Sequence, residues 1–122
     1  MKYQFINLNP LNELEEDCVC RAISYASGEN YETIKDKLYL IARIFDCETL
    51  CVCCYKHLLD DVFKYTRINL KETISIKDFL KYNDKGMFII RVNGHLTCAL
   101  NGQIKDTWDC SNELVDIFWI VK

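Results

Sequence analysis

Apolar positions follow a helical period in the first half of the chain and an extended period in the last third. Ile34, Leu38 and Ile41 belong to a stripe that predicts a helix over residues 31–45, with Asn30 as its N-cap. A helix over 17–27 is expected to begin at Asp17, whose carboxylate can cap the free amides of the first turn. It is expected to end at Gly28, which suits a left-handed terminator. We also expect a short helix over 76–81 and a mostly helical segment over 47–65, with four side chains turned inward: Leu58, Leu59, Val62 and Phe63.

The last third of the chain has the pattern of a small antiparallel sheet. Extended runs over 87–92, 95–100 and 103–108 are separated by the pairs Asn93-Gly94 and Asn101-Gly102, which favour tight hairpin turns. They predict a three-stranded meander, joined by a strand over 115–121, and residues 2–7 predict an edge strand. The fold class is therefore α+β, with N-terminal helices packed on a C-terminal antiparallel sheet.

Composition narrows the class of protein further. The chain has 122 residues, half of them hydrophobic, which fits one domain over residues 1–122. Its net charge of −3 comes without a basic block, so nucleic acid is not expected as a partner. No apolar run approaches the roughly 18 residues of a membrane span, and the N-terminus lacks the pattern of a signal peptide. We expect a cytoplasmic protein whose eight cysteines are free thiols.

Three residues form a candidate catalytic set. Cys18 falls in the first turn of a predicted helix, where the helix dipole and free amides favour a thiolate. His95 opens a strand directly after a tight turn, and Asp106 lies near the end of the neighbouring strand, where a carboxylate can orient an imidazole. A nucleophile, a base and an orienting group are what thiol acyl-transfer chemistry needs.

Two short motifs carry a family resemblance. The segment Asp17-Cys18-Val19-Cys20-Arg21-Ala22-Ile23 resembles the Asp-Cys-x-x-Arg-Ala-Ile segment of small papain-like proteins of phages and prophages, which are similar to bacteriocin-leader peptidases. The segment Gly94-His95-Leu96-Thr97-Cys98-Ala99, with Gly102 to Asp109 after it, resembles a second motif of the same proteins. The resemblance implies a papain-like cysteine peptidase fold.

The resemblance also implies roles for residues. It makes Cys18 the nucleophile, His95 the base and Asp106 the third member, with Asp109 as the alternative third member. Papain-like enzymes usually place a glutamine about six residues before the cysteine as an oxyanion donor, and Asn12 stands at that position here. The backbone amide of Cys18 is a second expected donor.

The sequence leaves two functions open. The first is a cofactor-free thiol hydrolase or acyl transferase acting on a peptide, an isopeptide or a side-chain amide. The alternative is a catalytically idle fold that binds a host or phage protein. A weaker reading puts a metal on Cys47, Cys51 and Cys54, which would share one face if the segment were helical, although core packing is favoured for these thiols.

Overall fold

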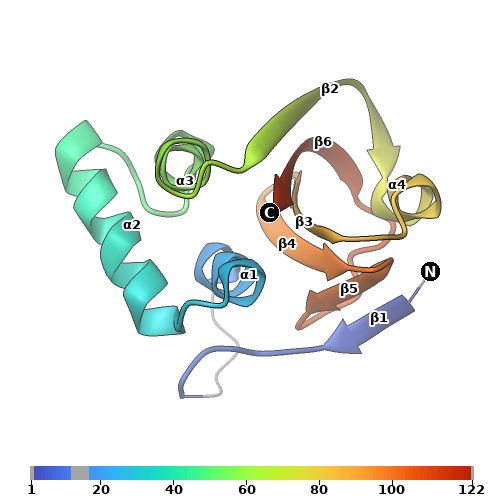
Figure 1. Cartoon of the computed structure of the whole chain (residues 1–122), viewed down its shortest axis with the longest axis horizontal. Coiled ribbons are helices and arrows are strands. Elements are labelled where there is room, and N and C mark those ends of the chain that lie inside the picture. The colour runs from blue at the N-terminus through green and yellow to red at the C-terminus, as the bar shows by residue number, and fades with distance from the viewer. Residues whose placement is uncertain (1, 12–16, 122) are drawn as a thin grey trace.

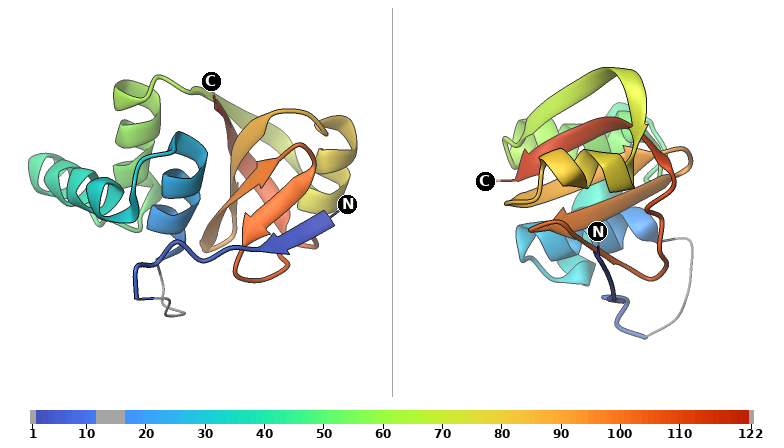
Figure 2. Two further views of the ribbon diagram at one scale, coloured as in Figure 1. Left: turned by 60° about the horizontal axis from the view of Figure 1, so that its bottom comes forward. Right: turned by 90° about the vertical axis from the view of Figure 1, so that its right-hand side faces the viewer.

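Helices cover both faces of one curved sheet in the computed structural model, which describes residues 2–11 and 17–121 (Figure 1). On one face lie α1 (Cys18–Ser27), α2 (Tyr31–Phe45) and α3 (Val52–His57), and α3 continues into the π-helical turn η1 (Leu58–Val62). The short helix α4 (Ile76–Tyr82) lies on the opposite face (Figure 2). The expected α+β class is confirmed for this described part of the chain.

The strands come from both ends of the chain and from its middle. Their spatial order is β1-β5-β4-β3-β6-β2. Their bounds are β1 (Lys2–Phe5), β2 (Thr66–Ser75), β3 (Met87–Val92), β4 (His95–Leu100), β5 (Gln103–Asp106) and β6 (Leu114–Val121). The antiparallel meander β3-β4-β5 and the β6 strand are confirmed, although β5 ends two residues earlier than expected.

Two features of the sheet differ from the prediction. The edge strand β1 is confirmed, but it pairs with β5 in parallel, so the sheet is mixed rather than wholly antiparallel. Strand β2, at the opposite edge, was not predicted. Most of its side chains are exposed, and its pairing with β6 shifts register between Asn69 and Ile74. Ile68, Leu70 and Ile74 do fall at alternate positions, but Glu72 interrupts this pattern, so the extended signal is weak.

Local capping explains where the helices begin and end. Asn30 Oδ1 accepts a hydrogen bond from the Thr33 backbone N–H at 2.8 Å, as expected for the start of α2. Gly28 ends α1 with a φ of 77°, a conformation that glycine adopts without strain. The cap expected from Asp17 is wrong in its chemistry, because its carboxylate makes no hydrogen bond to the first turn. That carboxylate instead meets the Arg21 guanidinium, with 2.7 Å between Asp17 Oδ1 and Arg21 Nε.

The segment over 47–65 is less helical than expected. Helix α3 begins only at Val52, and Cys51 is its extended N-cap residue, with a ψ of 142°. Leu58 and Leu59 are buried as predicted, whereas Val62 is 52% exposed. No helix in the described part of the chain is long and apolar enough to cross a lipid bilayer.

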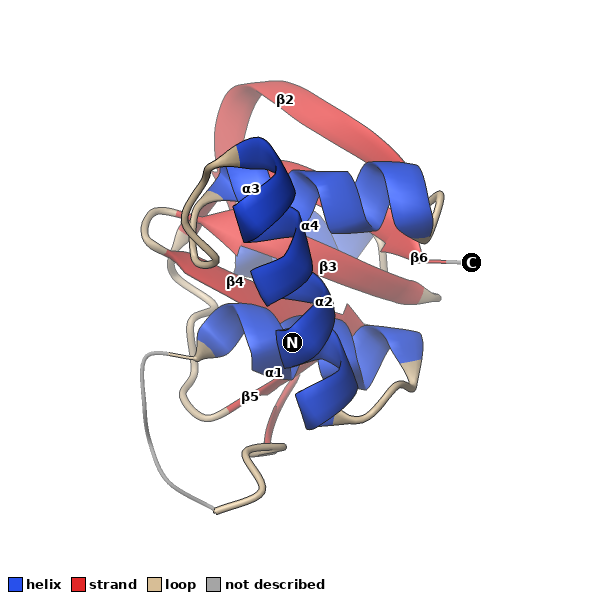
Figure 3. Cartoon of the chain, turned by 90° about the vertical axis from the view of Figure 1, so that its left-hand side faces the viewer, coloured by secondary structure: helices blue, strands red, loops and turns tan. Residues whose placement is uncertain are grey.

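Two apolar cores form because successive strand residues point to opposite faces of the sheet. On the face of α1, α2 and α3, strand residues including Ile89, Leu96 and Trp119 meet the helices. On the other face, Phe88 and Phe118 contact Phe79 of α4, with ring centroids 5.5 and 4.7 Å away. Helix α1 lies against β4 and α2 packs outside it, as Figure 3 shows from the helical side.

Ile23 tests the packing of α1 on the sheet. Its side chain is fully buried in the core on the side of α1, α2 and α3. We expect Ile23→Ala to lower the free energy of unfolding by about 2–5 kcal/mol, because it removes buried methyl groups and leaves a cavity. Urea denaturation followed by circular dichroism measures this. Ile44→Ala, at a side chain 65% exposed on α2, is the matched control, and equal losses for both variants would contradict the packing described.

Candidate active site

Cys18 is brought to the sheet by the packing of α1 on β4. It is the first residue of α1 and is half-buried beside the start of the strand. Burial raises the pKa of its thiol, but hydrogen bonds from the His95 ring and the Leu96 backbone N–H outweigh that effect. The nearby positive charges of His95 and Arg21 act in the same direction. The pKa of Cys18 therefore lies below its usual value, as expected for a reactive cysteine.

His95 and Asp106 form a short, buried pair. His95 Nε2 lies 2.7 Å from Asp106 Oδ2, and the two side chains are only 10% and 5% exposed. The strand register explains the contact, because β4 and β5 pair Ala99 with Ile104. Continuing that antiparallel ladder by two residues sets Asp106 opposite Thr97, which makes His95 its diagonal neighbour, within reach of a long side chain.

The same contacts determine the charge of the pair. Burial alone would lower the pKa of His95, but hydrogen bonds with Asp106, Cys110 and Cys18 raise it to about 11. Burial alone would raise the pKa of Asp106, and its bonds with His95 keep that pKa below its usual range. These shifts favour the thiolate form of Cys18, the imidazolium form of His95 and the carboxylate form of Asp106.

Arg21 links this group to the start of α1. Its Nη1 donates to Thr107 Oγ1 at 2.9 Å and lies 3.7 Å from Asp106 Oδ1. Its Nε faces Asp17, whose other carboxylate oxygen accepts from the Tyr31 hydroxyl at 2.7 Å. One buried guanidinium therefore connects the helix that carries the thiol to the strand that carries the carboxylate. The role of Arg21 was not predicted, although its position four residues after Asp17 is the usual spacing of a helical ion pair.

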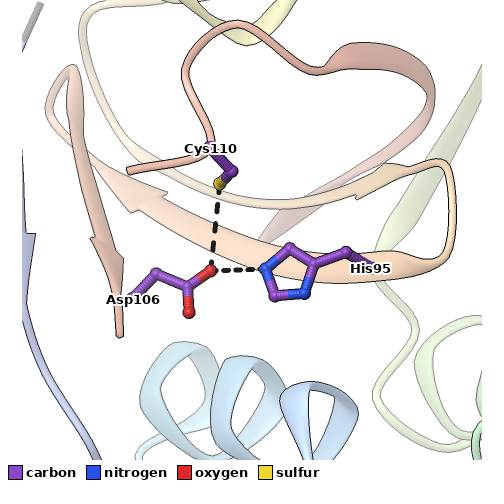
Figure 4. A group of neighbouring side chains, drawn as sticks. All are labelled: His95, Asp106 and Cys110. Atoms are coloured by element: carbon purple, nitrogen blue, oxygen red, sulfur yellow. Dashed lines mark hydrogen bonds and ion pairs between the residues drawn. The ribbon is translucent and has the colours of Figure 1, made fainter. Parts of the chain in front are cut away.

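Cys110 is a further neighbour that the sequence did not indicate. Its buried Sγ lies 3.9 Å from Asp106 Oδ2, the oxygen that also meets His95 (Figure 4). His95, Asp106 and Cys110 each offer a potential metal-ligating atom, and these atoms all lie within 4.8 Å of one another. This is the one such group among the described residues. Nitrogen, oxygen and sulfur donors of this kind suit zinc, but Nε2 and Oδ2 are already joined at hydrogen-bonding distance.

An open cleft of about 660 Å³ gives access to Cys18 and His95. Leu50, Val52 and Tyr55 form one side of it, and Trp108 and Arg91 line it as well. Trp108 is 44% exposed, with its ring centroid 5.0 Å from that of His95, and it forms part of the cleft wall. A cleft of this size is in the range of small-molecule and side-chain sites.

Other predicted site residues fall elsewhere. Asp109, the alternative third member, instead accepts a hydrogen bond from the Ser111 backbone N–H at 3.0 Å. Asn12, the expected oxyanion donor, lies outside the described residues. The face expected to join Cys47, Cys51 and Cys54 does not form, because α3 begins after Cys51 and Cys54 is buried with its Sγ 3.7 Å from the Leu38 carbonyl oxygen.

Comparison of the chain with models of known protein families, with curated proteins and with solved structures found no significant match.

The first test of this site is the reactivity of Cys18 against pH. Only a thiolate is alkylated rapidly, so the rate should rise with pH through the pKa of the thiol. Because that pKa is lowered, we expect the midpoint for Cys18 to lie below the pH of about 8.5 that is usual for a free cysteine. Iodoacetamide labelling of the native protein, read out by peptide mass spectrometry, measures each cysteine separately. A Cys18 midpoint at or above 8.5 would contradict the geometry described.

Asp106→Asn tests the carboxylate. An amide carries no charge, so the variant should lower the pKa of His95 and, through it, raise the midpoint of Cys18 alkylation. Asp109→Asn changes the same chemistry three residues away, where the side chain serves only a local turn, and should leave the midpoint unchanged. The assignment of Asp106 would fail if both variants shifted the midpoint equally, or if only Asp109→Asn did.

Proposed function

We propose that the protein is a papain-like thiol hydrolase or acyl transferase that acts on a peptide, isopeptide or side-chain amide bond. The observation that carries the proposal is the position of the His95 ring, which bonds to Cys18 on one side and to Asp106 on the other. Nε2 meets the carboxylate, which leaves Nδ1 for the sulfur. This is the order of contacts that a nucleophile, a base and an orienting group require.

In the first half of the proposed reaction, the Cys18 sulfur attacks the carbonyl carbon and a C–S bond forms. The imidazolium of His95 then gives its proton to the leaving nitrogen, the C–N bond breaks, and a thioester remains on Cys18. The carboxylate of Asp106 stabilises the positive ring before the transfer and holds its orientation throughout.

In the second half, neutral His95 takes a proton from water or from an acceptor amine. The oxygen or nitrogen attacks the thioester, the C–S bond breaks, and the thiolate–imidazolium pair is restored. Whether the acceptor is water or an amine decides between hydrolysis and acyl transfer. The half-open cleft beside Cys18 admits either of them.

The negative oxygen formed in each half needs hydrogen-bond donors. The backbone N–H of Cys18 is suited to this, because the first backbone N–H groups of an α-helix have no partner within the helix. Helix α1 makes its first such bond only from the Arg21 N–H to the Asp17 carbonyl oxygen. Asn12 stays a predicted second donor.

The walls of the cleft support a protein or peptide as the reacting partner. Val52, Tyr55 and Trp108 offer apolar and aromatic surface to a side chain near the reacting amide. Arg91 adds a positively charged side chain, whose Nη1 forms an ion pair with Asp116 Oδ2 at 2.7 Å. Such a cleft combines apolar contact with a few polar groups, as binding sites for small groups generally do.

Acylation by p-nitrophenyl acetate tests the proposed function without knowledge of the substrate. We expect the wild-type protein to form an acetyl thioester on Cys18 and to hydrolyse it. His95→Ala should slow both steps by about 10²–10⁴-fold, because the general acid and base is lost. Release of p-nitrophenol measures the rate, and mass spectrometry of quenched samples locates the acetyl group.

Cys53→Ser is the matched control for this experiment, because Cys53 is an exposed thiol outside the group around His95 and should not affect acylation of Cys18. Failure of Cys18 to become acylated, or equal acylation in His95→Ala, would contradict the proposed function. That result would agree with the alternative of a catalytically idle fold that binds another protein.

A further inference from the structure

A pair of thiols stands at the rim of the cleft and has no part in the proposed reaction. Cys51 and Cys53 are separated in sequence by Val52 alone, and their sulfur atoms lie 2.9 Å apart. Cys53 is exposed, whereas Cys51 is half-buried and lines the cleft beside Leu50 and Val52. A soluble reagent can therefore reach the pair without any opening of the core.

The two sulfurs are electrostatically unequal. Hydrogen bonds from the Cys53 thiol and backbone N–H keep the pKa of Cys51 below its usual value. The same contact with Cys51 raises the pKa of Cys53 to about 11. Cys53 therefore donates to Cys51, and the sulfur of lowered pKa is the better first nucleophile of the two near neutral pH.

The other two cysteines of this segment lie close to the pair, since Cys47 contacts both Cys53 and Cys54. Cys54 is buried and its pKa is raised to about 12, first by burial and then by contact with Cys47. A tetrahedral zinc site would hold two sulfurs roughly 3.8 Å apart, since each Zn–S bond is about 2.3 Å long. The 2.9 Å separation of Cys51 and Cys53 is shorter than that, so the two sulfurs would have to move apart to hold a zinc ion.

We propose that Cys51 and Cys53 form a reversible dithiol–disulfide site that reacts with low-molecular-weight disulfides such as glutathione disulfide. The proposal does not rest on the proposed hydrolase function, because neither sulfur contacts Cys18 or His95 in the interactions described. Transient disulfides of this kind are the usual form of disulfide in a reducing compartment.

The exchange takes place in two balanced steps. The Cys51 thiolate attacks one sulfur of glutathione disulfide, which forms a mixed disulfide and releases one glutathione thiolate. Cys53 then loses its proton to solvent and attacks the Cys51 sulfur, which forms the Cys51–Cys53 bond and releases the second glutathione. Counted from the Cys51 thiolate, the protein loses two electrons and one proton, and the small disulfide is reduced to one glutathione thiolate and one glutathione thiol.

Closing this bond would change the cleft wall directly. Val52 would lie inside the ring that the disulfide closes, and its side chain lines the cleft with Cys18. The Cys51 carbonyl oxygen also accepts the first hydrogen bonds of α3, from the N–H groups of Cys54 at 2.9 Å and Tyr55 at 3.2 Å. The redox state of the pair is therefore coupled to the segment that forms one side of the cleft.

The test uses the full chain with Cys18→Ser, so that the activated thiol of the proposed active site does not compete. The protein is incubated with glutathione disulfide, quenched with acid, and analysed by intact mass and peptide mapping. We expect loss of two hydrogens, no retained glutathione, a link between Cys51 and Cys53, and full reversal by excess glutathione. Adding Cys53→Ser should stop the reaction at one stable glutathione on Cys51.

Cys20→Ser in the same background is the matched control, because this buried thiol on α1 contacts neither Cys51 nor Cys53, and it should behave like its parent. The proposal would be overturned by no reaction, by glutathione retained on the parent protein, or by a disulfide that maps to Cys47. Continued loss of two hydrogens in the Cys53→Ser variant would overturn it as well. Because Cys18 is absent throughout, none of these outcomes bears on the proposed hydrolase function, which the acylation of Cys18 tests by itself.

Discussion

The buried carboxylate of Asp106 is the constraint on which the site depends. Burial of a charge is costly unless opposite charges and hydrogen bonds compensate it. Here His95 Nε2 lies 2.7 Å away, the Thr107 backbone N–H donates at 2.6 Å, and Arg21 lies 3.7 Å away. These partners belong to β4, to the end of β5 and to α1, so satisfying one carboxylate fixes three elements relative to one another. The position of the Cys18 sulfur beside the imidazole follows from that arrangement.

Much of the fold could be predicted because its periodic segments are strongly marked. The stripe around Leu38 and the two Asn-Gly turns gave α2 and the hairpins correctly. The edges could not be predicted in this way. Strand β2 is mostly exposed and has a register shift, and the parallel pairing of β1 with β5 depends on where the chain returns in space. Neither property is encoded in local hydrophobic alternation.

The candidate site was predictable to the extent that it lies on regular elements. Cys18 at a helix start and His95 after a turn follow from local signals, and the antiparallel register places Asp106 beside them. Arg21 and Cys110 could not be assigned roles, because their contacts join positions far apart in sequence or depend on an irregular loop. The cap expected from Asp17 failed for a related reason, since the Arg21 charge competes with the backbone amides for the same carboxylate.

The environment of each thiol, rather than the presence of cysteine, determines its chemistry. Burial raises the pKa of Cys20 to about 11 and leaves that thiol inert, although it lies two residues from Cys18 on the same helix. Cys18 differs because a charged ring and a backbone N–H face its sulfur. The account of the site therefore depends on the imidazole being positively charged beside the sulfur at neutral pH.

The charge of His95 is the most direct measurement of that claim. The chain has two histidines, so ring ¹⁵N chemical shifts can be assigned with a single His57→Gln variant and followed as a function of pH. We predict that the His95 ring stays protonated through neutral pH and loses its proton only as the pH approaches about 11. A His95 ring that titrates near 6.5, the value of an unperturbed histidine, would contradict it.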